Sequence, residues 1–178
     1  ILWWSPDPRM VLYPNAIKIS KSMRKVIREG VFTLSFDTAF EEVITACQNI
    51  PRPDQEGTWI SKDIVSSYTE LHRKGYAHSV EVWSNKCLVG GLYGVSLGGA
   101  FFGESMFSNI SNASKFAFIQ LAEFLFEKGF DLIDCQVHTD HLESLGAQRI
   151  SRAIFLSQLS TSLKKHTFQG DWGSLFSL

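Results

Sequence analysis

Two polar side chains, Asp134 and Gln136, lie two residues apart in an otherwise apolar segment, residues 132–137. Apolar and β-branched residues that follow a glycine, here Gly129, are typical of a short strand. Strand side chains alternate between faces, so Asp134 and Gln136 point the same way. Because burying such groups without partners is costly, we interpret them as a polar site on a rigid strand. A hydrogen-bonded structural pair is the alternative.

A third polar residue, Glu104, lies in another strand-like segment, residues 100–106. The alternation of a strand places Glu104 on the same face as Phe102 and Met106. If this strand neighbours the first, Glu104 converges with the aspartate and the amide beside an apolar wall. Such a site suits a substrate that has a positive charge and an apolar side chain. A buried polar cluster without a ligand is the alternative.

Cations gather on a predicted helix that begins after Ser20 and ends before Gly30. Their spacing of i, i+3, i+4 and i+7 forms one continuous basic face, made of Lys21, Arg24, Lys25 and Arg28. Residues 1–30 carry a net charge of +4 and the remainder −5, although the whole chain has only −1. This face predicts phosphate binding, with an ordinary solvated surface as the alternative.

The length of 178 residues fits one domain with a sizeable core, and 44% hydrophobic and 20% charged residues are globular values. No apolar run approaches the ~20 residues that a membrane span needs. The chain opens on Ile1-Leu-Trp-Trp-Ser5 without an initiating Met or a signal peptide. We therefore expect a single domain over residues 1–178, in which residues 1–9 are the remnant of a missing N-terminal region.

The three cysteines, Cys47, Cys87 and Cys135, are far apart and lack a disulfide spacing. This usage favours reduced thiols and a cytoplasmic location. Cys135-x-x-His138-x-x-His141 has metal-like spacing, but no other strong ligand cluster completes it. We expect no metal.

The remaining pattern predicts an α/β fold with a mixed, largely antiparallel sheet flanked by helices. Asp37 is expected to cap the second helix, and residues 50–57 form the clearest loop. The predicted strands are residues 10–13, 17–19, 33–36, 77–83, 87–95, 100–106, 132–137 and 150–155. The predicted helices after the basic one are residues 38–48, 62–74, 113–128 and 156–165.

Several short motifs occur together in one order along the chain. They are Trp3-Trp4-Ser-Pro-Asp-Pro-Arg9, Gly57-Thr-Trp-Ile60, Ala77-His-Ser-Val-Glu81, Val89-Gly-Gly-Leu-Tyr-Gly-Val95, Gly103-Glu-Ser-Met-Phe-Ser108, Ala113-Ser-Lys115, Ile133-Asp-Cys-Gln136 and Ser144-Leu-Gly-Ala147. With these motifs the chain strongly resembles the leucyl/phenylalanyl-tRNA–protein transferases of bacteria, up to about residue 155.

The resemblance implies an enzyme that moves Leu or Phe, sometimes Met, from its tRNA to a protein beginning with Arg or Lys. The new N-terminus marks that protein for degradation. The resemblance also implies an N-acetyltransferase-like (GNAT-like) fold that is used without acetyl-CoA. We expect a cytoplasmic monomer that needs no cofactor. Family members carry a region ahead of Trp3, including a Gly-Ile-Phe-Pro-Trp-like segment, which this chain lacks.

The resemblance assigns the positions of Asp134 and Gln136 to activation of the acceptor α-amine. A neutral amide is a poor base, so we interpret Gln136 as a positioning acceptor and Asp134 as the group that holds and helps deprotonate the amine. Glu104 completes the acidic acceptor site, and the basic face takes the tRNA acceptor stem. The expected substrate pocket consists of Met106, Leu121, Leu125, Ile133 and Trp59.

Two other functions remain open. An acetyl-CoA-dependent N-acetyltransferase would bind pyrophosphate at a Gln/Arg-x-x-Gly-x-Gly/Ala turn before a helix. The longest helix here opens with Asn109-Ile-Ser-Asn-Ala-Ser114, which lacks those glycines. A non-enzymatic RNA-binding module would explain the basic face, but not the polar groups on the two strands.

Overall fold

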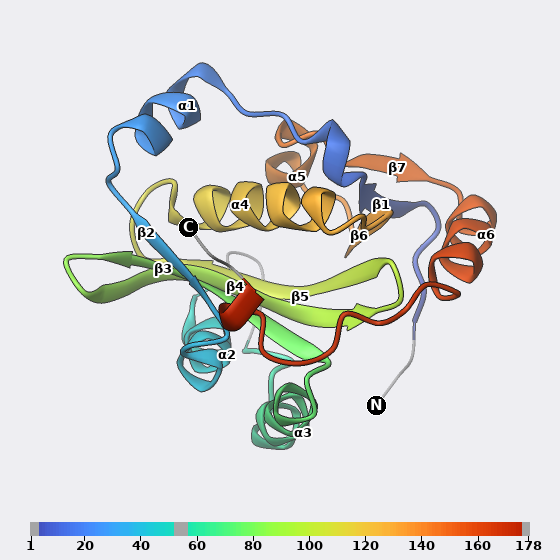
Figure 1. Ribbon diagram of the computed structural model, residues 1–178, viewed down its shortest axis with the longest axis horizontal. Coiled ribbons are helices and arrows are strands. Elements are labelled where there is room, and N and C mark those ends of the chain that lie inside the picture. Colours follow the sequence, from blue (N-terminus) through green and yellow to red (C-terminus); the bar gives the residue numbers. More distant parts are fainter. Residues whose placement is uncertain (1–3, 52–56, 176–178) are drawn as a thin grey trace.

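One mixed sheet lies at the centre of the structure, a computed structural model that describes residues 4–51 and 57–175 (Figure 1). Its seven strands run in the order β2-β3-β4-β5-β6-β1-β7. All neighbours are antiparallel except β5 and β6, which are parallel. The strands are β1 (Arg9–Leu12), β2 (Thr33–Phe36), β3 (Ala77–Ser84), β4 (Cys87–Leu97), β5 (Ala100–Ser108), β6 (Leu132–Gln136) and β7 (Gln148–Ile150).

Helices cover both faces of this sheet. In Figure 1, α1 (Lys21–Arg28), α4 (Ala113–Glu127) and α5 (Asp140–Ser144) lie on one side, and α2 (Phe40–Asn49) and α3 (Lys62–Arg73) lie on the other. The last helix, α6 (Arg152–Ser162), packs Phe155 against β1, β5 and β6. Two short 3₁₀ helices are η1 (Pro14–Ala16) and η2 (Gly173–Leu175). The predicted fold class, a mixed and largely antiparallel sheet flanked by helices, is confirmed.

The meander β3–β4–β5 is the best-predicted part of the sheet. Asn85 and Lys86, with φ of +50° and +65°, make the two-residue turn between β3 and β4. Positive φ at both positions matches the turn to the twist of the flanking strands. Gly98, with φ of +56°, adopts the same left-handed backbone conformation in the turn between β4 and β5.

Helix α4 carries the largest share of the core. Its apolar residues are spread around most of the helix, so both the sheet and α1 can pack on it. Gly90 of β4 lies so close that a Cβ there would meet the Ala113 Cβ at 2.5 Å. The fully buried Trp172, from the segment after α6, stacks on His78 and contacts the rings of Phe36 and Phe124.

Three local predictions are wrong. Residues 17–19 form no strand, because the chain leaves η1 in an irregular path. The strand predicted over residues 150–155 ends at Ile150, since Ser151 accepts a hydrogen bond from the Ile154 amide and starts α6 early. Asp37 does not cap α2, whose N-cap is Ala39. Residues 52–56 of the predicted loop lie outside the described residues.

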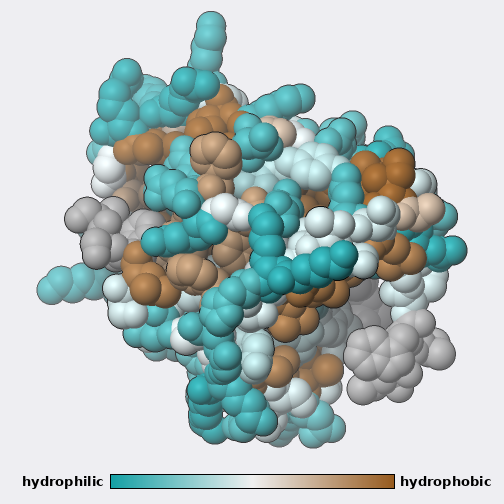
Figure 2. Space-filling model, turned by 45° about the vertical axis from the view of Figure 1, so that its right-hand side comes forward, coloured by the Kyte–Doolittle hydropathy of each residue, from teal (hydrophilic) through white to brown (hydrophobic). Residues whose placement is uncertain are grey.

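The surface carries scattered apolar groups. Figure 2 brings the α6 side forward and shows apolar patches separated by long hydrophilic side chains. Among the described residues, no helix combines the length and the apolar character needed to cross a bilayer.

Candidate active site

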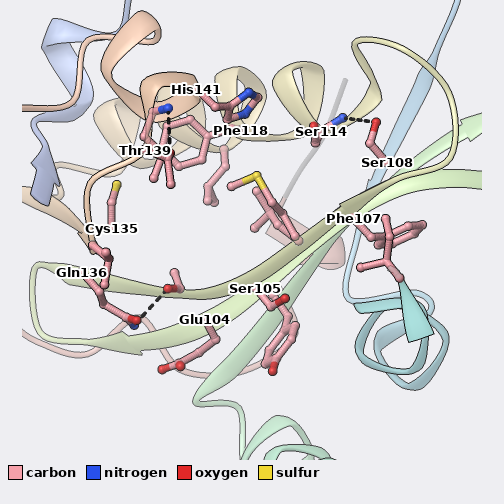
Figure 3. Close-up of a pocket in the computed structure, with 18 of the residues that line it drawn as sticks. Glu104, Ser105, Phe107, Ser108, Ser114, Phe118, Cys135, Gln136, Thr139 and His141 are labelled. Atoms are coloured by element: carbon pink, nitrogen blue, oxygen red, sulfur yellow. Dashed lines mark hydrogen bonds between the residues drawn. The ribbon is translucent and has the colours of Figure 1, made fainter. Parts of the chain in front are cut away.

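The site forms where β5 and β6 separate. These parallel strands pair only from Ala100 to Phe102, opposite residues 132–134 of β6. Beyond these pairs a pocket of about 670 Å³ opens between the strands, α4, α5 and the residues that flank the 52–56 segment (Figure 3). A pocket of this size suits a small molecule or one end of a larger one.

A β-bulge on β5 directs Glu104. Gly103 pairs with Gly94 of β4 and Ser105 pairs with Tyr93, so Glu104 is the extra residue between them. A bulge of this kind interrupts the alternation of a strand and re-aims its side chains. Glu104 therefore hydrogen-bonds Tyr68 on the α3 side of the sheet, whereas Met106 packs with the α4 core on the other. The prediction that Glu104 and Met106 share a face is wrong for this reason.

Asp134 is fully buried and its charge is already matched. The Arg9 guanidinium donates from Nε to Oδ1 at 2.9 Å and from Nη2 to Oδ2 at 2.6 Å. Arg9 reaches it because β1 lies beside β6, with Val11 opposite Asp134. The Arg9 side chain is only 13% exposed and its guanidinium also lies over the Phe155 ring. This two-pronged geometry is the strongest form of ion pair in proteins, and it fixes the carboxylate in place.

Gln136 connects the two acidic residues. Its backbone has φ of +63°, and its N–H donates to Asp134 Oδ1 at 3.0 Å. Its side-chain Nε2 donates to the Gly103 carbonyl at 3.0 Å, as Figure 3 shows, and the amide also hydrogen-bonds Glu104. The turn at Gln136 ends β6 one residue earlier than predicted and leaves Val137 exposed. The three polar residues are thus brought together as expected.

Glu104 differs from Asp134 in its electrostatic surroundings. Burial raises the pKa of the Glu104 carboxyl above its ordinary value, while hydrogen bonds from Tyr68 and Gln136 act in the opposite direction. The negative charge of Asp134 also raises the pKa of Glu104, and the charge of Arg9 lowers it. Burial and the Glu104 charge raise the pKa of Tyr68 far beyond the neutral range, so its hydroxyl remains a donor.

The apolar wall of the pocket lies on the α4 side of the sheet. Of the predicted substrate residues, Met106, Leu121 and Trp59 line the pocket, joined by Phe101 and Phe118. Cys135 lines it as well, and burial raises the pKa of this thiol to about 12, so it is an apolar neutral group. Leu125 and Ile133 do not line the pocket. They are fully buried in the core behind it.

The predicted basic face is present on α1 and all four of its cations are exposed. Two of them have local contacts. Arg24 Nε donates to the Ile19 carbonyl at 3.2 Å, and Lys25 lies 3.7 Å from Glu29. Helix α1 lies above α4 (Figure 1), and none of its four cations lines the pocket.

The potential metal ligands group differently from the sequence spacing. Among the described residues, His138, Asp140 and Glu143 bring ligand atoms within 4.8 Å of one another, whereas Cys135 and His141 do not join them. His138 Nε2 instead pairs with Glu143 Oε2 at 2.7 Å, which also lowers the pKa of Glu143.

Two residues that contact the acidic groups of the site had not been assigned from the sequence. Arg9 lies 125 residues from Asp134, so only the pairing of β1 with β6 reveals the ion pair. Tyr68 looks like an ordinary apolar position of α3, and its contact with Glu104 depends on the bulge. The sequence signal for Arg9 is its place in the Trp3–Arg9 motif, whereas Tyr68 has none.

Relatives of known family resemble this chain over nearly its whole length. A family model described as leucyl/phenylalanyl-tRNA protein transferase matches residues 11–160. The leucyl/phenylalanyl-tRNA–protein transferase of Syntrophus aciditrophicus is 53% identical over 98% of this chain and 73% of its own length. The same-named protein of Flavobacterium johnsoniae is 54% identical over 90% of this chain and 76% of its own.

Solved structures resemble the fold at low sequence identity. A conserved protein of unknown function from Bacteroides thetaiotaomicron has a TM-score of 0.54 at 11% identity, covering 90% of this chain and 57% of that one. A GCN5-related N-acetyltransferase from Kribbella flavida has a TM-score of 0.47 at 9% identity, covering 82% and 55%. These likenesses concern the fold alone. The family model and the close relatives decide the identity: this chain belongs to the leucyl/phenylalanyl-tRNA–protein transferase family of enzymes.

Proposed function

We propose that this chain transfers Leu or Phe, and also Met, from aminoacyl-tRNA to proteins whose N-terminal residue is Arg or Lys. The observation that carries this proposal is a pocket with a carboxylate on one side and an apolar wall on the other. Glu104 supplies the carboxylate, and among the described residues no Lys or Arg lies within ion-pair distance of it. A ligand that brings its own positive charge therefore completes this site.

The reaction needs little from the protein besides alignment. The ester between the amino acid and the tRNA is already activated. The acceptor α-amine attacks the ester carbonyl carbon, a C–N bond forms, and the C–O bond to the ribose breaks. The proton lost by the amine ends on the departing ribose oxygen. Holding the two reactants together can supply most of the required acceleration, about 7–11 kcal/mol in favourable cases.

Gln136 and Glu104 are the residues we assign to the acceptor amine. The Gln136 N–H groups point to acceptors of the protein, so its carbonyl oxygen is the atom left to receive a hydrogen bond from the amine. Glu104 binds the positive charges of an N-terminal Arg or Lys. The pKa of Glu104 is raised toward neutral pH, and a carboxylate with such a pKa is a better proton acceptor at that pH.

Asp134 acts through its neighbours in this proposal. Its oxygens are occupied by Arg9 and the Gln136 backbone, and it does not line the pocket. We therefore assign it a positioning role, in which it fixes the turn at Gln136, in place of direct deprotonation of the amine. The apolar wall around Met106 and Leu121 holds the Leu or Phe side chain.

The exposed cations of α1 bind tRNA phosphates in this proposal. Replacing Lys25 and Arg28 by Glu should weaken binding of Phe-tRNA by about ten-fold or more at low salt and flatten its salt dependence. The matched control replaces Lys62 and Lys74, two exposed cations at the ends of α3, by Glu. A filter-binding titration that shows equal losses for both pairs would remove α1 from the tRNA site.

The physiological part of the proposal follows from the product. An acceptor that gains an N-terminal Leu or Phe is marked for degradation, and the enzyme acts as a monomer in the cytoplasm. The direct test measures transfer of labelled Phe from charged tRNA to a peptide beginning with Arg, with acetyl-CoA as the competing donor. We expect Phe transfer that acetyl-CoA does not reduce. Acetylation of the peptide without Phe transfer would establish the N-acetyltransferase alternative instead.

A further inference from the structure

Two polar groups on the α4–α5 side of the pocket have no role in the proposed reaction. His141 of α5 lines the pocket together with Ser114 of α4, and Figure 3 shows both on the side of the pocket opposite Glu104. The Nε2 atom of His141 is buried and has no hydrogen-bond partner among the described residues. Buried polar atoms are nearly always paired, so an unpaired one in a pocket indicates a missing ligand atom.

Lys115 adds a positive charge beside this histidine. It follows Ser114 in the first turn of α4 and is half-buried. Within the described part of the chain, no carboxylate lies within ion-pair distance of its ammonium group. Burial and the Lys115 charge lower the pKa of His141, so its imidazole is neutral at pH 7 and can donate a hydrogen bond from one ring nitrogen.

The nearby acidic groups are engaged or directed elsewhere. Glu143 of α5 pairs with His138 at 2.7 Å, and Asp140, whose side chain is fully exposed, lies 4.0 Å from the same histidine. The Ser114 backbone N–H donates to Ser108 Oγ at 3.3 Å, and as a donor it cannot accept a hydrogen bond from His141. His141 thus lines the pocket as a neutral donor without a protein acceptor for Nε2, and the Lys115 charge acts on this histidine from beside the pocket.

We propose that Lys115 and His141 bind the phosphate of the 3′-terminal nucleotide of aminoacyl-tRNA. This inference rests on the proposed function, because it takes aminoacyl-tRNA as the donor. The ester lies on the ribose of that nucleotide, so its phosphate is the negative charge nearest to the reacting carbon. Gln136 and His141 line the same pocket, so a donor whose ester lies against Gln136 can present its phosphate to His141.

The test uses two stable donor analogues that differ only in one phosphate. In both, Phe is joined by an amide to 3′-amino-3′-deoxyadenosine, and one of them carries a 5′-phosphate. Calorimetry gives the Kd of each for the full chain. We expect the phosphate to tighten binding about ten-fold, as one charge-assisted contact typically does. Lys115→Gln and His141→Gln should each remove most of that difference and leave the Kd of the analogue without phosphate unchanged.

Conservative and distant variants separate binding from structure. Lys115→Arg should keep the phosphate preference, whereas Lys25→Gln on α1 should leave it intact while weakening full-length tRNA binding. Equal Kd values for the two analogues with the parent chain, or an undiminished preference in both Gln variants, would overturn this inference. Tight, phosphate-dependent binding without any Phe transfer from charged tRNA would overturn the proposed function instead and leave the phosphate site standing.

Discussion

Asp134 and Glu104 are carboxylates on neighbouring parallel strands, yet they are neutralised in different ways. Asp134 has a buried Arg9 guanidinium on both of its oxygens. Glu104 has a tyrosine hydroxyl, an amide and a raised pKa, and it opens into the pocket. The protein therefore supplies the counter-charge of Asp134 itself, whereas no Lys or Arg of the described residues pairs with Glu104.

This difference distinguishes a carboxylate that stabilises the structure from one that is available to a ligand. A buried charge that is matched inside the protein contributes to the shape of the site, and its loss is felt by the whole fold. A partly desolvated charge that lacks a cation contributes little to the fold but discriminates strongly between charged and neutral ligands. The comparison leads to three predictions, which test the two carboxylates against each other.

The largest effect is expected from Arg9→Gln. This change leaves the fully buried Asp134 without its cation, and removing one partner of a buried pair typically costs about 3–5 kcal/mol of unfolding free energy. Glu104→Gln should change the stability by less than about 1 kcal/mol, because it removes a charge that burial disfavours and leaves no buried cation without a partner. Urea unfolding of both variants measures this contrast. Equal losses in the two variants would abolish the distinction.

The second effect concerns acceptor choice. Glu104→Gln keeps the shape of the side chain and removes its charge, so transfer to Arg-starting peptides should fall relative to Ala-starting ones. A charge-assisted contact of about 1.5–3 kcal/mol corresponds to a ten- to hundred-fold change in that ratio. The matched control is Glu123→Gln on the outer side of α4, which should leave the ratio unchanged. An Arg/Ala ratio that survives Glu104→Gln removes Glu104 from acceptor recognition.

The smallest effect is on pH dependence. Glu104 must be ionised to hold the acceptor cation, and its pKa is raised, so binding of an Arg-starting peptide should strengthen as the pH rises through that pKa. The Tyr68 hydrogen bond lowers this pKa, so Tyr68→Phe should move the transition to higher pH and weaken binding a few-fold on the acidic side. Tyr13→Phe, whose hydroxyl bonds Gln158 at 3.0 Å, is the control. Peptide titrations across the acidic range test the direction, and a shift to lower pH contradicts it.

Local signals explain what could be predicted from the sequence. The turn at Asn85 and Lys86, the caps of α1 and α3, and the apolar character of α4 all have short-range causes. The convergence of Glu104, Asp134 and Gln136 could be predicted once two strands were placed side by side. Leu125 and Ile133 lie behind the lining of the pocket. For Leu125, α4 is apolar around most of its circumference, so its pattern does not identify the face that meets the cavity. Ile133 lies on β6 opposite Phe101, where β5 and β6 are still paired.

Features that depend on distant pairing could not be predicted. Gly103 and Gly94 flank the bulge at Glu104, but glycines occur elsewhere in these strands, so only the one-residue shift in the pairing of β4 with β5 locates the bulge. The partner of Asp134 comes from a strand at the other end of the chain. Strand alternation therefore identifies the polar residues of the site, but it cannot give their directions or their partners.

The position of β1 between β6 and β7 also affects how the site is assembled. Arg9 and Asp134 are 125 residues apart in the sequence, so their contact closes a long loop of the chain. Closing long loops costs conformational entropy before the contact is gained, and such contacts form late when a domain folds. During synthesis from the N-terminus, Arg9 is made first and has no partner until β6 has emerged. The Arg9–Asp134 ion pair is therefore completed only when β1 and β6 meet, so incompletely folded chains lack the contact that fixes the Asp134 carboxylate.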